Sequence, residues 1–279
     1  MWQAAHRLAD YLEAVASDVG LDRPGAKILE LGAGTGWLGM VLARNLPDAE
    51  RVVATEMASG GALEWLRRNV RKNESLAEER GCQLWPPGRL QTEECDWSVY
   101  QGGAPSVSGY GVDDADDAEE DKPGPAPGSV AGSIPGSSTL DAVPWDFIVG
   151  SDLVYDDNGV RMLPRVIRSL LEKAAAARAN PDLDLGLDPN APPPRAYYCH
   201  TKYRYELRDI EFYAEMRACG LEMKEVREPG VPTPPASPEP LSQLFPEKRV
   251  AVYRVQVLPL PNGNSENLLS DTMFLESNQ

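Results

Sequence analysis

The sequence predicts an α/β protein whose mostly parallel sheet is covered by helices on both faces. Helical and strand patterns alternate along the chain, as in parallel sheets with crossover helices. The segment 26–34, AKILELGAG, is an apolar run that ends in glycines, and a second apolar run, WDFIVGSDLVY, lies at 145–155. Runs of this kind are typical of strands that are buried on both faces.

The first third of the chain contains three predicted helices and two predicted strands. Apolar residues at helical spacing predict the first helix over 5–19, where the pattern includes Leu8, Tyr11, Leu12 and Val15. A strand at 26–31 then leads through glycines into a helix over 36–46. The run RVVATEM predicts a strand at 51–57, and the amphipathic segment 61–73 predicts the next helix.

The remaining segments continue the alternation. Their patterns predict a weak strand within 82–97, a strong strand at 145–155, helices at 158–179 and 207–219, and strands at 195–203, 221–226 and 249–257. Ligands of such sheets bind at the carboxyl ends of the strands, near the point where the strand order reverses. We therefore expect the chemistry just after residues 31, 56, 96, 150 and 200.

Three stretches interrupt this pattern and contain 18 of the 25 prolines: 101–144, 181–194 and 229–246. The first includes the acidic run DDADDAEED, and each has few residues that could be buried. Such composition does not offset the entropy of ordering, so we expect disordered loop insertions. The pieces between them are too short for separate cores, which predicts one domain over 1–258 and a flexible tail over 259–279.

Composition excludes several functions. The 279 residues carry a formal net charge of −16, and the isoelectric point is near 4.6, which argues against nucleic-acid binding. Four scattered cysteines and two histidines indicate neither a disulfide framework nor a metal site. No apolar run approaches the ~18 residues of a membrane span. These features predict a cytoplasmic protein, with the nucleus as the other possible location, and no membrane partner.

The glycine loop after the first strand predicts a cofactor site. Glu30-Leu-Gly32-Ala-Gly34-Thr-Gly36 joins a strand to a helix, where glycines permit a tight turn and close approach to a ligand. Gly34, Gly36 and the later Gly39 also satisfy the dinucleotide fingerprint, and Glu56 lies where a ribose-binding acid belongs. The motif alone therefore leaves NAD and S-adenosylmethionine open.

A glycine turn without a ligand is disfavoured because Glu30, the glycines and Glu56 coincide in a strand-turn-helix-strand context. Three features favour S-adenosylmethionine over NAD. We expect the Glu30 carboxylate to point into the site, where it would repel a pyrophosphate and attract a sulfonium. No second domain remains to hold a hydride acceptor. Tyr198 and Lys202 have the spacing of a reductase pair, but they fall on a predicted strand, where that pair needs a helix.

Four patches carry a family resemblance: Trp2 with AAHRLADYL, and the segments 28–43, 52–73 and 146–157. Together they resemble the seven-strand S-adenosylmethionine-dependent methyltransferases. Asp152-Leu-Val-Tyr155 matches the D-x-x-Y motif of the eukaryotic group 16 protein-lysine methyltransferases, and Trp2 and Trp97 also fit that group. The resemblance implies a Rossmann-like sheet of seven strands.

The resemblance also implies roles for individual residues. The implied cofactor-binding residues are Trp2, Glu30, Gly32, Ala33, Gly34, Gly36, Glu56, Met57, Asp96, Trp97 and Ser151. Among them, Glu56 would accept hydrogen bonds from the ribose hydroxyls, and Asp96 and Trp97 would border the adenine. Trp97 could instead cover a sheet edge, Trp2 could be a core aromatic, and Cys199-His200 is interpreted as strand packing.

Asp152 and Tyr155 are the candidate catalytic residues, and they would orient a lysine amine through hydrogen bonds. The alternative is that Asp152 caps the following helix and Tyr155 packs beneath it. Members of the group usually carry more chain before the tryptophan, so we expect either a truncated N-terminus or a missing wall of the substrate entrance.

The sequence thus predicts an S-adenosylmethionine-dependent methyltransferase that acts on a lysine of a protein. It does not define the oligomeric state, for which a monomer is favoured. An acidic enzyme attracts a basic protein partner. The alternatives are a small-molecule N-methyltransferase, a cofactor-binding protein without activity and, with less support, an NAD-dependent oxidoreductase.

Overall fold

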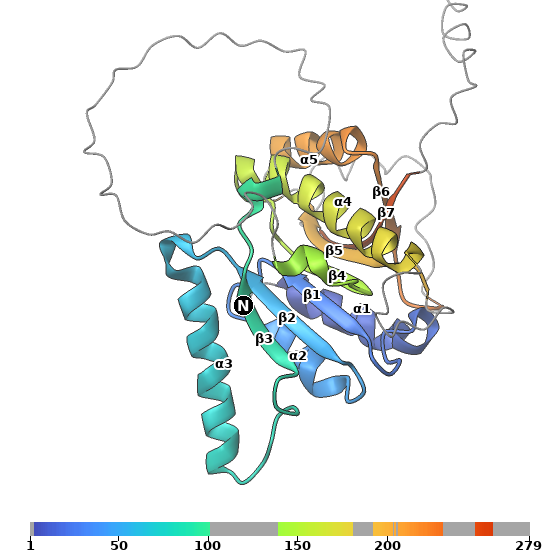
Figure 1. The fold of residues 1–279 in the computed structure, drawn as a ribbon. Coiled ribbons are helices and arrows are strands. Elements are labelled where there is room, and N and C mark those ends of the chain that lie inside the picture. Colours follow the sequence, from blue (N-terminus) through green and yellow to red (C-terminus); the bar gives the residue numbers. More distant parts are fainter. Residues whose placement is uncertain are drawn as a thin grey trace, which may run out of the picture.

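A single seven-stranded sheet forms the centre of the residues that the computed structural model describes, namely 3–100, 139–180, 192–202, 204, 206–230 and 249–258 (Figure 1). The strands are β1 (Lys27–Leu31), β2 (Arg51–Glu56), β3 (Leu90–Glu94), β4 (Phe147–Ser151), β5 (Arg195–Lys202), β6 (Leu221–Val226) and β7 (Arg249–Val257). Their order is β3-β2-β1-β4-β5-β7-β6. The first five are parallel, and β7 runs antiparallel to both β5 and β6, which confirms the predicted fold class.

Helices cover both faces of this sheet (Figure 1). The helices are α1 (Gln3–Val19), α2 (Trp37–Asn45), α3 (Ala62–Glu79), α4 (Asp157–Ala179) and α5 (Glu206–Ala218). One apolar core contains residues of α1, α2 and α3, and a second contains residues of α4 and α5. Because successive strand residues point to opposite faces, Ile28 belongs to the first core and Leu29 to the second. The alternation predicted from the sequence is confirmed in these elements.

In the connections that the structure describes, there are three short 3-10 helices: η1 (Ser59–Gly61), η2 (Trp97–Tyr100) and η3 (Thr139–Ala142). The last lies inside the range 101–144 that was expected to be an insertion. There Leu140 is buried, and the Tyr100 hydroxyl donates to Asp141 Oδ1 over 3.1 Å. Residues 101–138, 181–191, 231–246 and 259–279, to which the other disorder predictions apply, lie outside the described residues.

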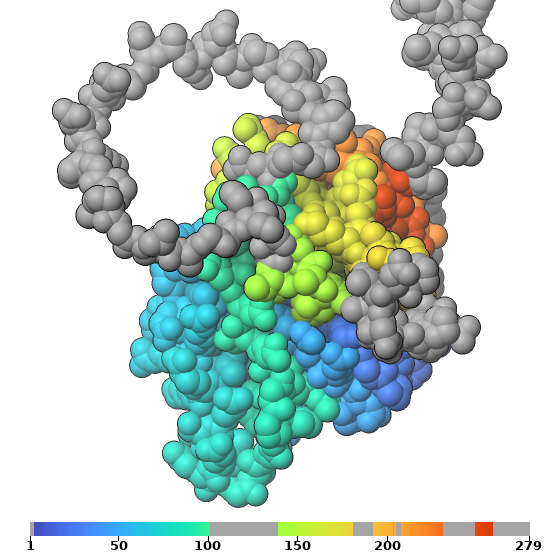
Figure 2. All heavy atoms as spheres, viewed as in Figure 1, coloured from blue at the N-terminus to red at the C-terminus, as the bar shows by residue number. Residues whose placement is uncertain are grey.

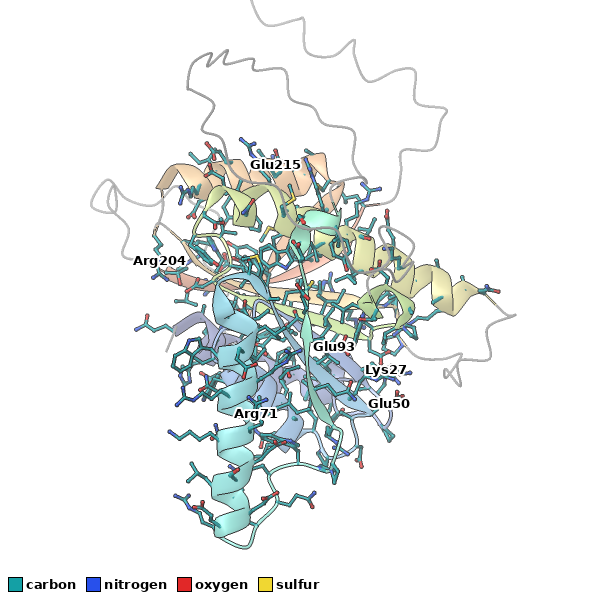
Figure 3. The ribbon with its side chains drawn as sticks, turned by 60° about the vertical axis from the view of Figure 1, so that its left-hand side comes forward. Lys27, Glu50, Arg71, Glu93, Arg204 and Glu215 are labelled. Atoms are coloured by element: carbon teal, nitrogen blue, oxygen red, sulfur yellow. The ribbon has the colours of Figure 1, made fainter. Side chains whose placement is uncertain are left out.

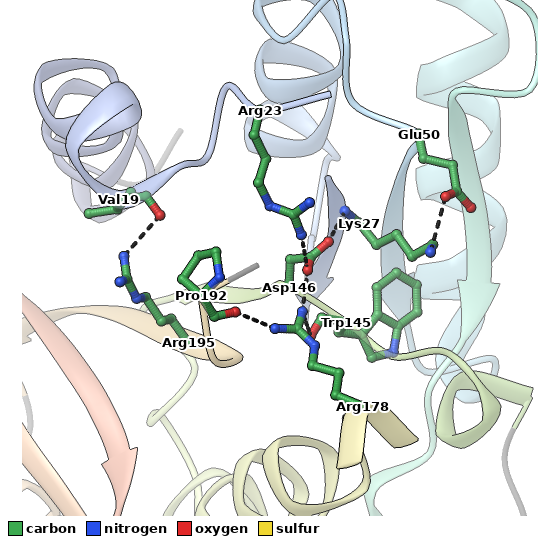
Figure 4. Close-up of polar contacts among 9 residues, drawn as sticks. All are labelled: Val19, Arg23, Lys27, Glu50, Trp145, Asp146, Arg178, Pro192 and Arg195. Atoms are coloured by element: carbon green, nitrogen blue, oxygen red, sulfur yellow. Dashed lines mark hydrogen bonds and ion pairs between the residues drawn. The ribbon is translucent and has the colours of Figure 1, made fainter. Parts of the chain in front are cut away.

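Charged side chains close the amino-terminal edge of the sheet (Figure 4). Asp146, just before β4, is buried, accepts from the Lys27 amide over 2.7 Å and pairs with Arg23 and Arg178. Burial lowers the pKa of Arg178, although the Asp146 charge acts in the opposite direction. The Lys27 ammonium pairs with Glu50 over 3.0 Å. A buried carboxylate needs such partners, so this cluster fixes the edge opposite the expected site.

Helix α3 and the turn that leads into β3 project from the rest of the molecule (Figure 2). Leu66 and Val70 on α3 are buried, whereas Trp65 is 60% exposed. Arg68 lies over the Trp65 ring, 5.2 Å from its centroid. No helix within the described part of the chain is long and apolar enough to cross a membrane.

Candidate functional site

The candidate site lies at the carboxyl-terminal edge of the sheet, around the junction of β1 and β4. The chain leaves β1 toward β2 on one side and leaves β4 toward β5 on the other. The two connections diverge at this point, which is where α/β sheets bind ligands. The glycine turn, Glu56 and the D-x-x-Y segment all follow strands at this edge.

The glycine turn has one open position between packed ones. Gly32 and Gly34 both have φ values in the left-handed region, at 57° and 56°. A Cβ on Gly32 would lie 2.4 Å from Cδ2 of the buried Leu153, whereas a Cβ on Gly34 would meet nothing within 4 Å. The Gly36 amide donates to the Ala33 carbonyl over 2.8 Å and closes the turn. Gly34 is therefore open where Gly32 is packed.

Glu56 faces this open position from the end of β2. Its Oε1 accepts from the Gly34 amide over 2.6 Å, and its Oε2 accepts from the Met57 amide over 3.2 Å. The Cys95 amide donates to the Glu56 carbonyl over 3.0 Å, which joins the ends of β2 and β3. Met57 itself is 48% exposed. The structure therefore brings Gly34, Glu56 and Met57 together, and their role in cofactor binding stays a prediction.

Glu30 differs from its predicted placement. Its side chain is buried between β1 and α2, where Oε2 accepts from the Gly39 amide in the first turn of α2 over 2.8 Å. Burial raises the pKa of Glu30 to about 8, and the Glu56 charge adds to this effect. Glu30 is therefore mostly neutral near pH 7 and holds the helix that follows the glycine turn. The expected carboxylate facing an open pocket is not observed, because the helix amide is its partner.

Asp96 and Trp97 begin the short helix η2 after β3. Asp96 Oδ1 accepts from the Ser98 amide over 2.9 Å, so this aspartate caps the helix. Trp97 is half-buried against the core beneath α4 and α5. The Asp96 carboxylate thus lies one residue after Cys95, whose amide donates a hydrogen bond to the Glu56 carbonyl. Both roles given to Trp97, bordering the adenine and covering a sheet edge, stay predictions.

Asp152 lies directly after β4 in an unusual backbone conformation. Its φ is 51°, a left-handed value that aspartate tolerates better than most residues. Oδ1 accepts from the Thr201 amide and Oδ2 from the Thr201 hydroxyl, each over 2.8 Å, and Arg204 lies 3.3 Å from Oδ2. The preceding residue, Ser151, pairs with Cys199 on β5 and is partly exposed.

Tyr155 is exposed at the same edge, with 56% of its surface accessible. Partial burial raises its pKa, and the charges of Asp156 and Glu56 act in the same direction. The alternative roles for this motif are wrong. Asp156, and not Asp152, caps α4 by accepting from the Gly159 amide over 2.8 Å, and Tyr155 is not packed beneath the helix.

Thr201 and Arg204 are site residues that the sequence did not single out. Thr201 ends the buried part of β5, and Arg204 follows that strand. In Figure 3, Arg204 lies at the end of the strands opposite Lys27 and Glu50. Their position just after residue 200 could have indicated them, because site residues were expected there although none was named.

Three other predictions concern Trp2, His200 and the pair of Tyr198 and Lys202. Trp2 lies outside the described residues. His200 is buried on β5, as the packing interpretation expected, and Lys202 on the same strand pairs with Glu225 over 2.7 Å. The Tyr198 and Lys202 pair therefore lies on a strand, as predicted. No group of His, Cys, Asp or Glu within the described ranges could hold a metal ion.

The first 85 residues match a known protein family. Residues 1–85 match the family model described as lysine methyltransferase. This segment contains the glycine turn and Glu56, and the match agrees with the resemblance drawn from the sequence motifs. A search of curated proteins finds no match.

Solved methyltransferase structures resemble this chain at low identity. An S-adenosylmethionine-dependent methyltransferase from Clostridium acetobutylicum is 9% identical, with a TM-score of 0.42, and the alignment covers 89% of this chain and 91% of that one. Precorrin-6y C5,15-methyltransferase from Geobacter metallireducens is 12% identical, with a TM-score of 0.37 and coverages of 87% and 86%. TrmN from Thermus thermophilus is 14% identical, with a TM-score of 0.38, and the alignment covers 88% of this chain and only 48% of TrmN.

The strand order itself defines the class of fold. It is the seven-stranded Rossmann-like fold of S-adenosylmethionine-dependent methyltransferases. Within that class, the N-terminal segment is similar to the lysine methyltransferase family over residues 1–85.

Proposed function

We propose that this chain is an S-adenosylmethionine-dependent methyltransferase that methylates a lysine side chain of a protein. The observation that carries the proposal is the open glycine turn, where the Glu56 carboxylate lies 2.6 Å from the Gly34 amide. A carboxylate there can accept hydrogen bonds from two adjacent ribose hydroxyls. The match of residues 1–85 to the lysine methyltransferase family supports the choice of acceptor.

The sheet supports this cofactor over NAD. Dinucleotide-binding sheets have the parallel order 3-2-1-4-5-6. Here the antiparallel strand β7 lies between β5 and β6, which departs from that order. Glu30 does not contribute to this preference, because burial keeps it mostly neutral near pH 7 and it would not repel a pyrophosphate.

The residues around Gly34 fit the parts of S-adenosylmethionine. The methionine and ribose moieties would lie at the open Gly34 position, beside Glu56. Exposed Met57 and the partly exposed Asp96 follow neighbouring strands and can border the adenine. The cofactor supplies a methyl group on a positively charged sulfur, and the protein must place an acceptor in line with it.

A lysine acceptor must lose its proton before transfer. With an ordinary pKa of ~10.4, deprotonation near pH 7.4 costs about 4 kcal/mol. The Asp152 carboxylate alone would oppose this loss, because a nearby negative charge stabilises the ammonium form. Arg204 pairs with Asp152 and offsets that charge. Asp152 can then orient the amine by accepting a hydrogen bond without holding the proton strongly, and the proton leaves to water.

The net charge of −16 suggests a basic protein as the partner. Acidic groups at the site's edge, Glu56, Asp96 and Asp156, would attract cationic residues near the target lysine. The same charge disfavours nucleic acid as the substrate.

Calorimetric titration with S-adenosylmethionine tests the cofactor assignment. We expect binding in the wild type and at least a tenfold loss in Glu56→Ala, because a charged hydrogen-bond acceptor contributes roughly 1.5–3 kcal/mol. Glu50→Ala is the matched control, since Glu50 precedes the same strand at the opposite edge. Absence of heat in the wild type, or equal affinity in the Glu56 and Glu50 variants, would overturn the assignment.

Incubation with methyl-labelled cofactor and a cytosolic extract tests the acceptor. The proposal expects a labelled protein band in which the methyl group is on lysine. Label confined to the small-molecule fraction would refute a protein substrate, and label in nucleic acid would refute the charge argument.

A further inference from the structure

A chain of buried polar groups connects α5 to the segment after β4. His200 on β5 and Asp209 on α5 are 2% and 6% exposed, and their Nε2 and Oδ1 atoms lie 2.8 Å apart. His200 Nδ1 lies 3.3 Å from the hydroxyl of the buried Tyr198. That hydroxyl accepts from the Leu153 amide over 3.1 Å. The chain therefore runs from Asp209 through His200 and Tyr198 to the backbone at Leu153.

Asp209 sets the direction of every hydrogen bond in this chain. An ionised carboxylate only accepts, so His200 donates through Nε2–H and presents Nδ1 as an acceptor. The Tyr198 hydroxyl can then donate its proton to Nδ1, which leaves its oxygen lone pairs free to accept from Leu153. The opposite histidine tautomer would leave the tyrosine proton without this acceptor.

The anchored backbone belongs to the proposed acceptor site. Leu153 follows Asp152, whose amide donates to the Cys199 carbonyl over 2.9 Å and whose carboxylate binds Thr201. All these partners are on β5. Leu153 also lies beneath Gly32, because a Cβ on that glycine would collide with it. One short segment therefore contacts both the glycine turn and the fifth strand.

The left-handed conformation of Asp152 needs this anchorage. A non-glycine residue in that region costs roughly 1–2 kcal/mol, and the surrounding contacts have to offset it. Leu153 directly follows Asp152, and its amide donates a hydrogen bond to the Tyr198 hydroxyl. Without it, the segment can relax toward an ordinary conformation and move the Asp152 carboxylate.

We propose that Tyr198 and His200, fixed by Asp209, are positioning residues that hold Asp152 and Leu153 in the geometry needed for methyl transfer. The proposal rests on the proposed function, because it assigns the purpose of the anchorage to the acceptor site. It gives a role to a tyrosine and a histidine that would otherwise be only core residues.

The test compares Tyr198→Phe with Tyr197→Phe in the full chain. Both variants remove one hydroxyl from a buried tyrosine on β5. Tyr197, however, belongs to the core on the opposite face of the sheet, where its side chain forms a hydrogen bond with Arg195. Nuclear magnetic resonance would follow the Leu153 amide. In Tyr198→Phe we expect its proton resonance to move upfield and its hydrogen exchange to rise roughly fivefold to tenfold, since one hydrogen bond is lost. In Tyr197→Phe both stay at wild-type values.

Transfer is then measured as label on the protein band that the wild type labels in the extract, at saturating S-adenosylmethionine. We expect the rate in Tyr198→Phe to fall at least tenfold and the rate in Tyr197→Phe to stay within twofold of wild type. An unchanged Leu153 amide in Tyr198→Phe would overturn the proposal, and so would an altered amide with a wild-type transfer rate. If the wild type binds no S-adenosylhomocysteine, the proposed function fails, and the amide data still decide whether Tyr198 anchors Leu153.

Discussion

Replacement of Glu30 by glutamine should change how stability depends on pH. Burial raises the pKa of Glu30 from its usual 4.5 to about 8, so between these values the folded protein holds a proton that the unfolded chain has lost. The free energy of unfolding then falls by ~1.36 kcal/mol per pH unit as the pH rises. The stabilisation is fully present below the unfolded pKa of 4.5 and is lost as the pH rises through the folded value. From about pH 5.5 to about pH 8.5 the loss is about 3 kcal/mol.

Glutamine keeps an acceptor for the Gly39 amide and never acquires a charge. We therefore expect Glu30→Gln to match wild type most closely below the unfolded pKa of 4.5, and its advantage over wild type to grow by about 3 kcal/mol from about pH 5.5 to about pH 8.5. Urea unfolding at several pH values measures both.

Glu50→Gln is the control for this experiment. Burial raises the pKa of Glu50, but the hydrogen bonds and charges of Lys27 and Arg51 together outweigh burial and leave the pKa below 4.5. This variant should therefore keep the wild-type slope above about pH 5.5. Parallel stability curves for wild type and Glu30→Gln across the window would refute the reasoning, because they would show that Glu30 is ionised in the folded protein.

Two further predictions concern the site. Gly32→Ala and Gly34→Ala both place alanine at a left-handed φ and should each lose roughly 1–2 kcal/mol, but only Gly32→Ala also collides with Leu153 and should lose roughly 1–3 kcal/mol more in urea unfolding. Gly34→Ala should instead weaken S-adenosylhomocysteine binding in calorimetry, and equal stability of the two variants would contradict the packing argument. Asp152→Asn keeps a residue type that tolerates the left-handed φ and an acceptor for Thr201, so it should fold and bind cofactor but transfer methyl at least tenfold more slowly in the labelling assay. A wild-type rate would remove Asp152 from the mechanism.

The strands and the glycine turn could be predicted because their signals are local. The apolar run at 26–31 and the glycines after it define a buried strand and a turn within a single window of sequence. The position of Glu56 beside the glycine turn could be predicted as well, because the carboxyl ends of neighbouring parallel strands lie at the same edge of the sheet. The edge itself was therefore predictable before any contact was known.

The partners of buried polar groups could not be predicted in this way. Asp152 meets Thr201 and Arg204 across about 50 residues of chain, and nothing near Asp152 in the sequence specifies that pairing. Glu30 shows the same limit: its position beside the glycine turn suggested a ligand contact, but the face of β1 on which it lies directs it to α2. Strand alternation was the available signal for that face.

The contact between Tyr100 and Asp141 has a consequence for how the protein can change in evolution. This hydrogen bond joins the two sides of the connection between β3 and β4, and the buried Tyr100 and Leu140 attach both sides to the core. Both ends of the connection are therefore attached to the core, while the two strands are placed by their pairing through β2 and β1. The intervening segment can gain or lose residues, or change its charge, without a change in the sheet that carries the site. Selection can thus act on the acidic segment and on the methyl-transfer edge as two separate traits.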